Sequence, residues 1–195
     1  MVVTLTPPLL DKACAELSHC IKIGGFEPVL IIGIKNGGAE VARRMRKDFC
    51  ETDYCEVRIS RPDTQQKEQG LAHKILQMMP LWLCDVLRIA ESRIREWLSR
   101  GKRPVRIGQM ALPQEAESKL RQSKSPKVLI VDDAIDTGAT IRMAKEQLQQ
   151  QYADAEVRVA VITVTTAAPI CEADYCLYHN RTLCRFPWSN DYKNI

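Results

Sequence analysis

Three continuous apolar runs, rich in β-branched residues, constrain the fold of this chain most strongly. They occupy residues 28–34, 127–133 and 157–166. A run without polar alternation is typical of a strand that is covered on both faces of a parallel sheet. Glycines and then a helical spacing of apolar residues follow the first two runs. Strand, turn and helix in this order predict an α/β fold with a largely parallel sheet.

Helical patterns lie before and between these strands. Residues 8–24 carry apolar side chains at spacings of three and four and stop at a glycine pair, which predicts an amphipathic helix. Residues 39–49 and the segment after Thr140 show the same spacing, so we expect a helix in each. Residues 54–60 alternate between apolar and polar side chains and predict a further strand.

Residues 64–100 depart from this alternation. Their apolar residues recur every three or four positions, which predicts two helices separated by Pro80. We keep three interpretations of these helices: scaffold or oligomer packing, a lid over a substrate, and a surface for a partner. The basic stretch 99–106 is interpreted as a solvated loop, with a phosphate-facing role as the alternative.

Length and composition limit the class of protein. A chain of 195 residues that is 45% hydrophobic and 27% charged can bury one core, so we expect a single domain over residues 1–195. The formal net charge of +4 gives little support to nucleic-acid binding as the main activity. Apolar runs too short to span a bilayer, and an N-terminus without a secretory signal pattern, predict a cytoplasmic location. The eight cysteines include no CxxC pair, which favours reduced thiols over disulfides or a metal site.

The stretch VLIVDDAIDTGAT combines acids with a turn that suits an anion. Asp132 and Asp133 close a predicted strand, which is where ligands of open α/β sheets bind. Ionised carboxylates accept hydrogen bonds, so this pair can receive the two hydroxyls of a ribose or attract Mg²⁺ and its waters. After a third acid, a glycine turn leads into a helix whose first N–H groups can hold a phosphate. The residues of this second part are Asp136, Thr137, Gly138, Ala139 and Thr140.

A ribose 5-phosphate carries hydroxyls at one end and a dianion at the other, so this stretch matches such a ligand. The alternative is a strand end with helix-capping acids and an ordinary turn. Because the strand, the acids and the Thr-Gly-x-Thr turn occur in one register, we interpret the stretch as a ligand site.

The same stretch resembles the signature that binds phosphoribosyl pyrophosphate in the type I phosphoribosyltransferase family. EPVLIIGIKNGGAEVARRM resembles the first strand and pyrophosphate loop of that family. ADYCLYHNRTLCRFPWSND resembles the C-terminal portion of bacterial xanthine-guanine and hypoxanthine-type purine phosphoribosyltransferases. The resemblance covers residues 28–60 and 127–191. It implies an open parallel sheet flanked by helices, with a helical insertion over about 64–100 and a small C-terminal hood region.

The resemblance also implies roles for individual residues. Asp132 and Asp133 would hold the ribose hydroxyls and, indirectly, Mg²⁺, with no direct metal ligand from the chain. Asp136 would lie nearest the incoming base as a general base or hydrogen-bond partner, so these three acids are the catalytic candidates. Residues 136–140 would bind the 5-phosphate. The residues that would contact the pyrophosphate are Lys35, Asn36, Gly37 and Gly38.

Some of these residues have an alternative interpretation, and two positions depart from the family pattern. Phe186 and Trp188 are a candidate stacking platform for a base, or else anchor the C-terminus in the core. For Gly37 and Gly38, the alternative to a pyrophosphate contact is a tight strand-to-helix turn. Asn36 stands where the family usually has Arg or Lys, and Ala168 stands where purine enzymes usually have a Lys before a proline.

These features predict a Mg²⁺-dependent phosphoribosyltransferase, a glycosyltransferase of the pentosyltransferase kind, that acts in nucleotide metabolism and purine salvage. It would move ribose 5-phosphate from phosphoribosyl pyrophosphate to a nitrogenous base, with a purine as the candidate class, and release pyrophosphate. We expect a homo-oligomer without a membrane partner. The alternative is a non-catalytic sensor or regulatory subunit that binds phosphoribosyl pyrophosphate or a nucleotide and acts through a protein or nucleic-acid partner. A third possibility is a generic nucleotide-binding fold.

Overall fold

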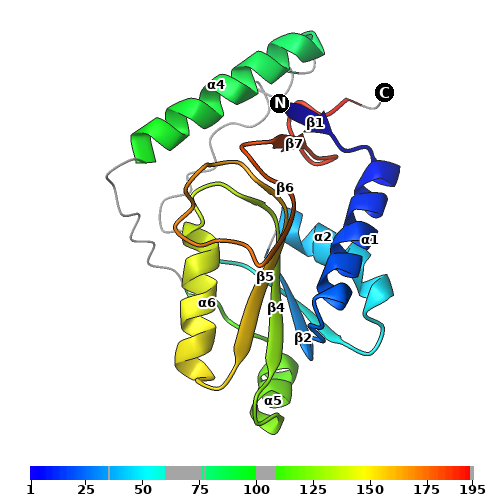
Figure 1. Cartoon of the computed structure of the whole chain (residues 1–195), viewed down its shortest axis with the longest axis vertical. Coiled ribbons are helices and arrows are strands. Elements are labelled where there is room, and N and C mark those ends of the chain that lie inside the picture. The colour runs from blue at the N-terminus through cyan, green and yellow to red at the C-terminus, as the bar shows by residue number, and fades with distance from the viewer. Residues whose placement is uncertain (35, 60–75, 77, 100–108, 194–195) are drawn as a thin grey trace.

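A parallel five-stranded sheet lies at the centre of the computed structural model, which describes residues 1–34, 36–59, 76, 78–99 and 109–193 (Figure 1). The strands lie in the order β3-β2-β4-β5-β6, and every neighbouring pair is parallel. Their bounds are Leu30–Ile34 (β2), Asp53–Val57 (β3), Lys127–Ile135 (β4), Glu156–Val164 (β5) and Tyr175–Tyr178 (β6). The predicted α/β fold with a parallel sheet is confirmed.

Both faces of the sheet are buried, because successive side chains of a strand point to opposite sides. In β2, Ile31 belongs to one hydrophobic core and Ile32 to the other. β4 repeats the pattern with Leu129 and Ile130. This double burial explains why the strands appear in the sequence as continuous apolar runs.

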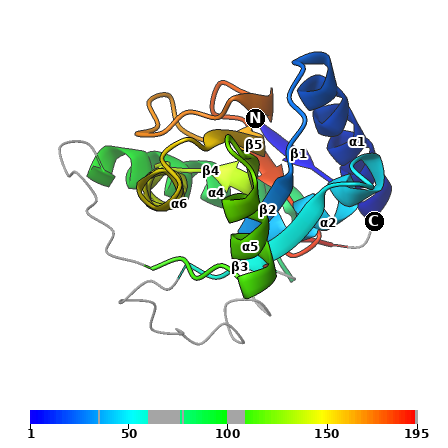
Figure 2. The same cartoon turned by 90° about the horizontal axis from the view of Figure 1, so that it is seen from below.

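Two pairs of helices cover the two faces of the sheet (Figures 1 and 2). α1 and α2 pack on the face that contains Ile31, and α5 and α6 pack on the face that contains Ile32. The helices predicted near residues 8–24, 39–49 and after Thr140 correspond to α1, α2 and α6. The bounds are Pro7–Ile23 (α1), Gly37–Met45 (α2), Gln114–Gln122 (α5) and Ala139–Gln151 (α6).

Sequence patterns did not indicate α5. This helix buries only Ala116 and Leu120, and most of its other residues are charged or polar. Two buried positions are too few to establish a helical period. The sheet face supplies the missing constraint, because α5 packs against β2 and β3.

Two element ends differ from the expectation. The helix expected over 39–49 ends at Met45, and a short 3-10 helix, η1 (Arg46–Asp48), follows. η1 buries none of its residues, so no packing supports a further α-helical turn. The strand expected over 54–60 ends at Val57, which pairs with the last residue of β2, and position 60 lies outside the described residues.

The described part of the inserted segment contains one long helix, α4 (Leu81–Ser99). It begins directly after Pro80, as predicted, and most of the helix expected before Pro80 lies outside the described residues. α4 crosses the end of the molecule opposite α5 (Figure 1). It lies beside a small parallel sheet formed by β1 (Val2–Thr4) and β7 (Leu183–Arg185).

A buried ion-pair network fastens α4 to the C-terminal segment. The side chain of Arg185, only 2% exposed, donates hydrogen bonds to Asp85 on α4, to Asp191 and to the Thr4 hydroxyl. Arg88 on α4 donates to the same Asp191 and to a main-chain carbonyl of β7. Because both arginines share one carboxylate, the position of α4 depends on the C-terminal segment.

None of the helices in the described ranges is long and apolar enough to cross a membrane. All eight cysteines are free thiols, and half of them, Cys14, Cys55, Cys84 and Cys184, are buried. Burial raises the pKa of the Cys184 thiol to about 11. A thiol with so high a pKa is a weak nucleophile at neutral pH.

Candidate active site

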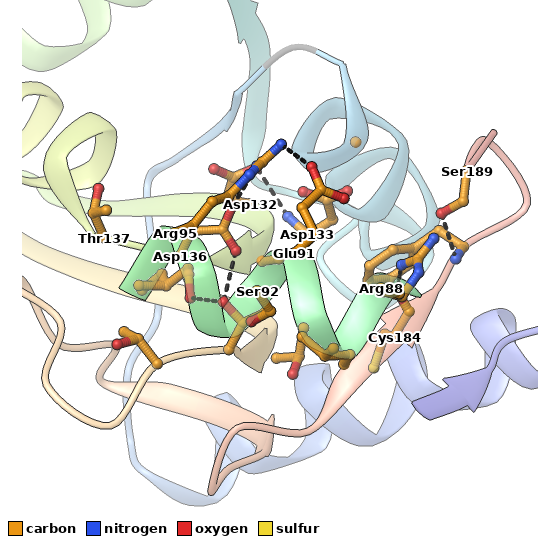
Figure 3. Close-up of a pocket in the computed structure, with 18 of the residues that line it drawn as sticks. Arg88, Glu91, Ser92, Arg95, Asp132, Asp133, Asp136, Thr137, Cys184 and Ser189 are labelled. Carbon is orange, nitrogen blue, oxygen red and sulfur yellow. Dashed lines mark hydrogen bonds and ion pairs between the residues drawn. The ribbon is translucent and has the colours of Figure 1, made fainter. Parts of the chain in front are cut away.

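A cavity of about 1280 Å³ opens at the carboxyl ends of β2, β4 and β5 (Figure 3). One wall is formed by residues 132–141, which span the end of β4 and the start of α6, and by Asn36 and Gly37 at the start of α2. The opposite wall is formed by α4, and the C-terminal segment closes one side. Ligands of open α/β sheets bind at this edge. The structure therefore brings the predicted acids, Asn36, Gly37 and the phosphate turn into one cavity.

The acid pair lies inside β4 rather than after it. β4 continues to Ile135, so the backbone of Asp132 and Asp133 is held in the sheet and their side chains are half-buried. The Asp133 N–H donates to Asp132 Oδ1 at 2.9 Å, and the indole Nε1–H of Trp188 donates to Asp133 Oδ2 at 2.9 Å. Each carboxylate is thus oriented by one hydrogen bond and keeps further acceptor positions.

Burial raises the pKa of both carboxyls. For Asp132, the neighbouring charge of Asp133 adds to the effect of burial, and the pKa lies well above its usual range. For Asp133, the Trp188 hydrogen bond opposes the rise in pKa, because it stabilises the charged form. Both shifts disfavour the doubly charged form of the pair. Hydroxyl donors or a cation from a ligand favour its full ionisation.

The first residues of α2 lie directly against the acid pair. A Cβ atom at Gly37 would overlap the Asp133 carboxylate, and a Cβ atom at Gly38 would lie 2.5 Å from the carbonyl oxygen of Val131. Only glycine fits this approach, so both positions let α2 pack closely against β4, and their contact with a pyrophosphate stays a prediction. Lys35, the remaining residue of the predicted pyrophosphate contact, lies outside the described residues.

The turn into α6 has the geometry of a phosphate site. Gly138 has a φ of 80°, in the left-handed region, and a Cβ atom there would lie 2.8 Å from the Cys171 amide nitrogen. α6 begins at Ala139, so its first-turn N–H groups face the cavity end. The Thr137 hydroxyl accepts a long hydrogen bond of 3.4 Å from the Ala139 N–H. A phosphate oxygen can replace so weak an acceptor.

Asp136 is exposed within the cavity and contacts two neighbours. The Thr165 hydroxyl donates to Asp136 Oδ1 at 2.6 Å. Arg95 Nη1, on α4, lies 4.0 Å from Asp136 Oδ2. Figure 3 shows Arg95 reaching from α4 toward the acids of β4. The carboxylate therefore sits where β4, β5 and α4 meet.

Phe186 and Trp188 lie against each other. Their ring centroids are 4.9 Å apart and the planes differ by 6°, so the rings are stacked. Phe186 is 4% exposed and belongs to the core on the α1 side, whereas Trp188 is half-buried and donates to Asp133; both residues line the cavity. Stacking of a base on these rings stays a prediction.

Sequence reasoning missed several residues of the cavity wall. Arg58 directly follows β3, and the rule that ligands bind beyond parallel strands could have found it. Thr165 directly follows β5 and could have been found in the same way. Glu91 and Arg95 come from α4. Helical spacing shows that these two share a face with Arg88, but it does not show which site that face covers.

The fold and the cavity define an α/β protein whose site lies at the carboxyl edge of a parallel sheet. A family model of the phosphoribosyl transferase domain matches residues 5–178. The chain belongs to the phosphoribosyl transferase domain family, and this membership makes it an enzyme of the glycosyltransferase type. No sequence among curated proteins matches the chain.

Solved structures with the same fold cover nearly the whole chain. The purine phosphoribosyltransferase from Pyrococcus horikoshii is 18% identical with a TM-score of 0.60, over 100% of this chain and 97% of that chain. The xanthine-guanine-hypoxanthine phosphoribosyltransferase from Helicobacter pylori is 12% identical with a TM-score of 0.61, over 96% and 94%. A hypothetical protein from Neisseria gonorrhoeae with bound ppGpp is 16% identical with a TM-score of 0.60, over 96% and 89%. At these identities the likeness concerns the fold.

Proposed function

We propose that this chain transfers ribose 5-phosphate from phosphoribosyl pyrophosphate to a purine base and releases pyrophosphate. One observation carries the proposal: the acid pair of β4 lies beneath the Gly37 turn and beside the phosphate turn of α6, in one cavity. A pyrophosphate, a sugar diol and a terminal phosphate occur in this order in the proposed donor. Purine is the proposed class of base because similar folds include purine phosphoribosyltransferases.

The donor is held by groups at both ends of its sugar. Asp132 and Asp133 accept hydrogen bonds from the two ribose hydroxyls, because ionised carboxylates are acceptors only. The 5-phosphate lies on the first N–H groups of α6, with Thr137 and Thr140 as side-chain donors. The pyrophosphate lies against the Asn36–Gly38 turn, with Arg58 near it.

The acid pair also fits Mg²⁺. This ion prefers oxygen ligands and usually combines one or two carboxylates with substrate phosphates and water. Among the described residues, no group of three or more metal-ligating side chains could hold an ion alone. When bound, Mg²⁺ neutralises the charge that develops on the leaving pyrophosphate.

The chemical step is a displacement at the anomeric carbon. A base nitrogen forms a bond to this carbon while the bond to pyrophosphate breaks, and the bonding electron pair leaves with pyrophosphate. Asp136, oriented by Thr165, accepts the proton or hydrogen bond of the base ring. α4 covers the cavity and limits access of water, which would otherwise attack the same carbon.

Pyrophosphate release in the presence of Mg²⁺ and a panel of purine and pyrimidine bases tests this function. We expect release that depends on a purine and is lost in Asp136→Asn. Asp154→Asn, an exposed residue before β5, is the matched control and should retain activity. Donor binding without turnover on any base would reject the transferase and leave the second candidate.

The second candidate is a non-catalytic sensor that binds phosphoribosyl pyrophosphate or a nucleotide. Ala168 and Asn36 are uncharged, whereas the family usually has a basic residue at each of these positions. In addition, α4 forms a cavity wall that could move when a ligand binds and so transmit binding to a partner. A similar fold binds ppGpp in the Neisseria gonorrhoeae protein. Tight nucleotide binding by a chain that never releases pyrophosphate would favour this candidate.

We further propose a single domain over residues 1–195, a cytoplasmic location and a homo-oligomer. The outer face of α4 supports the last of these. It exposes Trp82, Val86, Ile94 and Trp97, each more than half exposed. Light scattering of the purified chain measures its molar mass, and a monomer at all concentrations would reject the oligomer.

A further inference from the structure

The three arginines among the described residues of the cavity lining occupy different places. Arg88 is committed to Asp191 and to a carbonyl of β7, so it holds α4 in position. Arg58 follows β3, whose pairing with β2 places it on the side of the Asn36 turn. Arg95 extends from α4 toward Asp136, at the other end of the acid pair.

Arg95 is suited to exchange its partner for a ligand. Its side chain is 66% exposed, and its partners are Glu91, one turn earlier on α4, and Asp136. The Asp136 contact is a long one of 4.0 Å, and Asp136 is itself exposed. A contact between exposed charges contributes little, so an acceptor that enters between the two groups meets a small cost.

Arg95 and Asp136 together present a donor and an acceptor to the same part of the cavity (Figure 3). One edge of an oxopurine carries a ring nitrogen next to an exocyclic oxygen, and guanidinium groups bind this edge in other settings. A guanidinium has donors only. If the base carries an amino group in place of the oxygen, this amino group and the Arg95 guanidinium are both donors, and no hydrogen bond forms between them.

We propose that Arg95 is a specificity-determining residue that donates to the exocyclic oxygen of a 6-oxopurine, while Asp136 accepts from the imidazole ring of the same base. This inference rests on the proposed function, in which Asp136 faces the base. α4 thereby provides the cationic donor that Ala168, exposed in the loop after β5, does not provide.

Arg95 is carried to the cavity by α4 and has a second contact on that helix. Glu91 holds its guanidinium at 2.5 Å from one carboxylate oxygen. α4 is in turn fixed by the buried side chain of Arg185 through Asp85. Removal of the Arg95 side chain therefore deletes one donor without releasing the helix that carries it.

The test compares nucleotide binding and turnover in four forms of the full chain. Calorimetry measures the affinity for inosine 5-phosphate and adenosine 5-phosphate, which differ at the 6-position, and for phosphoribosyl pyrophosphate. Steady-state assays compare hypoxanthine with adenine. The forms are wild type, Arg95→Ala, Arg95→Lys and Arg93→Ala, the last an exposed arginine of α4 outside the cavity lining that pairs with Glu96.

We expect wild type to prefer the inosine nucleotide and hypoxanthine. Arg95→Ala should reduce this preference by about tenfold or more, through weaker binding of the oxo compounds alone, with unchanged donor affinity. Arg95→Lys should keep part of the preference, because it retains a cationic donor. Arg93→Ala should behave as wild type, and all four forms should unfold at similar temperatures.

Several results overturn the inference. An unchanged preference in Arg95→Ala, an equal loss for both nucleotides, or a loss of donor affinity in its place would each exclude base selection by Arg95. A wild type that binds the adenosine nucleotide more tightly would exclude it as well, while the proposed transferase would survive. A wild type that binds neither donor nor nucleotide would overturn both.

Discussion

The cavity has two facing walls of different construction. The sheet wall, residues 36–38 and 132–141, places backbone groups and glycine against two carboxylates that are themselves part of a strand. The helix wall, the cavity face of α4, places long charged side chains there and is fastened by ion pairs. The first wall is fixed by main-chain geometry. The second is fixed by charges that a single substitution can remove.

This difference assigns separate tasks to the two walls. Groups that bind the part of a substrate common to all reactions belong on the rigid wall, where their geometry cannot vary. Groups that select among bases can lie on the helix wall, because a side chain such as Arg95 is replaced without disturbing the sheet. The predictions below change one wall at a time.

The largest effect is expected from the fastening of the helix wall. Arg185→Met removes a buried cation, leaves Asp85 without this partner and leaves Asp191 with Arg88 alone, so the free energy of unfolding should fall by about 3–5 kcal/mol. Chemical denaturation measures this change. Arg121→Met, at an exposed pair on α5, should change the same free energy by less than about 0.5 kcal/mol. Equal effects in the two variants would show that α4 is not held by the network.

The next effect concerns the sheet wall. Gly37→Ala places a methyl group where the Asp133 carboxylate lies, so the acid pair must move and donor affinity should fall by about a hundredfold. Calorimetry with phosphoribosyl pyrophosphate measures the loss. Gly25→Asn is the control, because Gly25 has a φ of 65° with open space around it, and asparagine tolerates that conformation. Unaltered binding in Gly37→Ala would separate the glycine turn from the donor site.

A smaller effect, of opposite sign, is expected for stability at Asp132. The raised pKa of this carboxyl means that the folded chain binds its proton more tightly than the unfolded chain. Its contribution to stability is therefore lost as pH rises from the unfolded pKa of about 3.9 through the folded pKa. Asp132→Asn should unfold at a higher temperature than wild type at pH 7, with the difference vanishing near pH 3. A lower unfolding temperature at pH 7 would contradict the burial of this charge.

The smallest effect on the folded chain is expected from the outer face of α4. Trp82→Gln with Trp97→Gln should change the free energy of unfolding by less than about 0.5 kcal/mol, because both side chains are exposed. In a homo-oligomer that uses this face, the same double variant should dissociate in light scattering. A large loss of stability in a monomer would mean that these tryptophans pack within the chain.

Much of the sheet wall could be predicted from the sequence, because its constraints are local. The apolar runs of β2, β4 and β5 followed from burial on both faces, and the acids and glycines lie within a few residues of the strand ends. The turn before α6 could be predicted from Gly138 itself, and the structure shows that this glycine has a left-handed φ of 80°. Each of these features depends on neighbours in the chain.

The helix wall could not be predicted in the same way, because its contacts connect residues that are distant in the sequence. Spacing indicated a helix after Pro80, but it did not indicate that Arg95 would face Asp136 or that Arg185 would fasten Asp85. The sequence also predicted the role of Trp188 only in part. Its indole N–H donates to Asp133, a contact that depends on the fold of the C-terminal segment over the cavity.

Calorimetric titration of phosphoribosyl pyrophosphate with Mg²⁺ tests the central claim most directly, namely that β4 and the start of α6 hold the donor. We predict that wild type binds, and that Asp133→Asn and Thr140→Ala each weaken binding by about tenfold or more, since hydrogen bonds to charged groups contribute about 1.5–3 kcal/mol. Asp154→Asn should bind as wild type does. Absence of binding by wild type, or equal affinity in all four forms, would contradict the account.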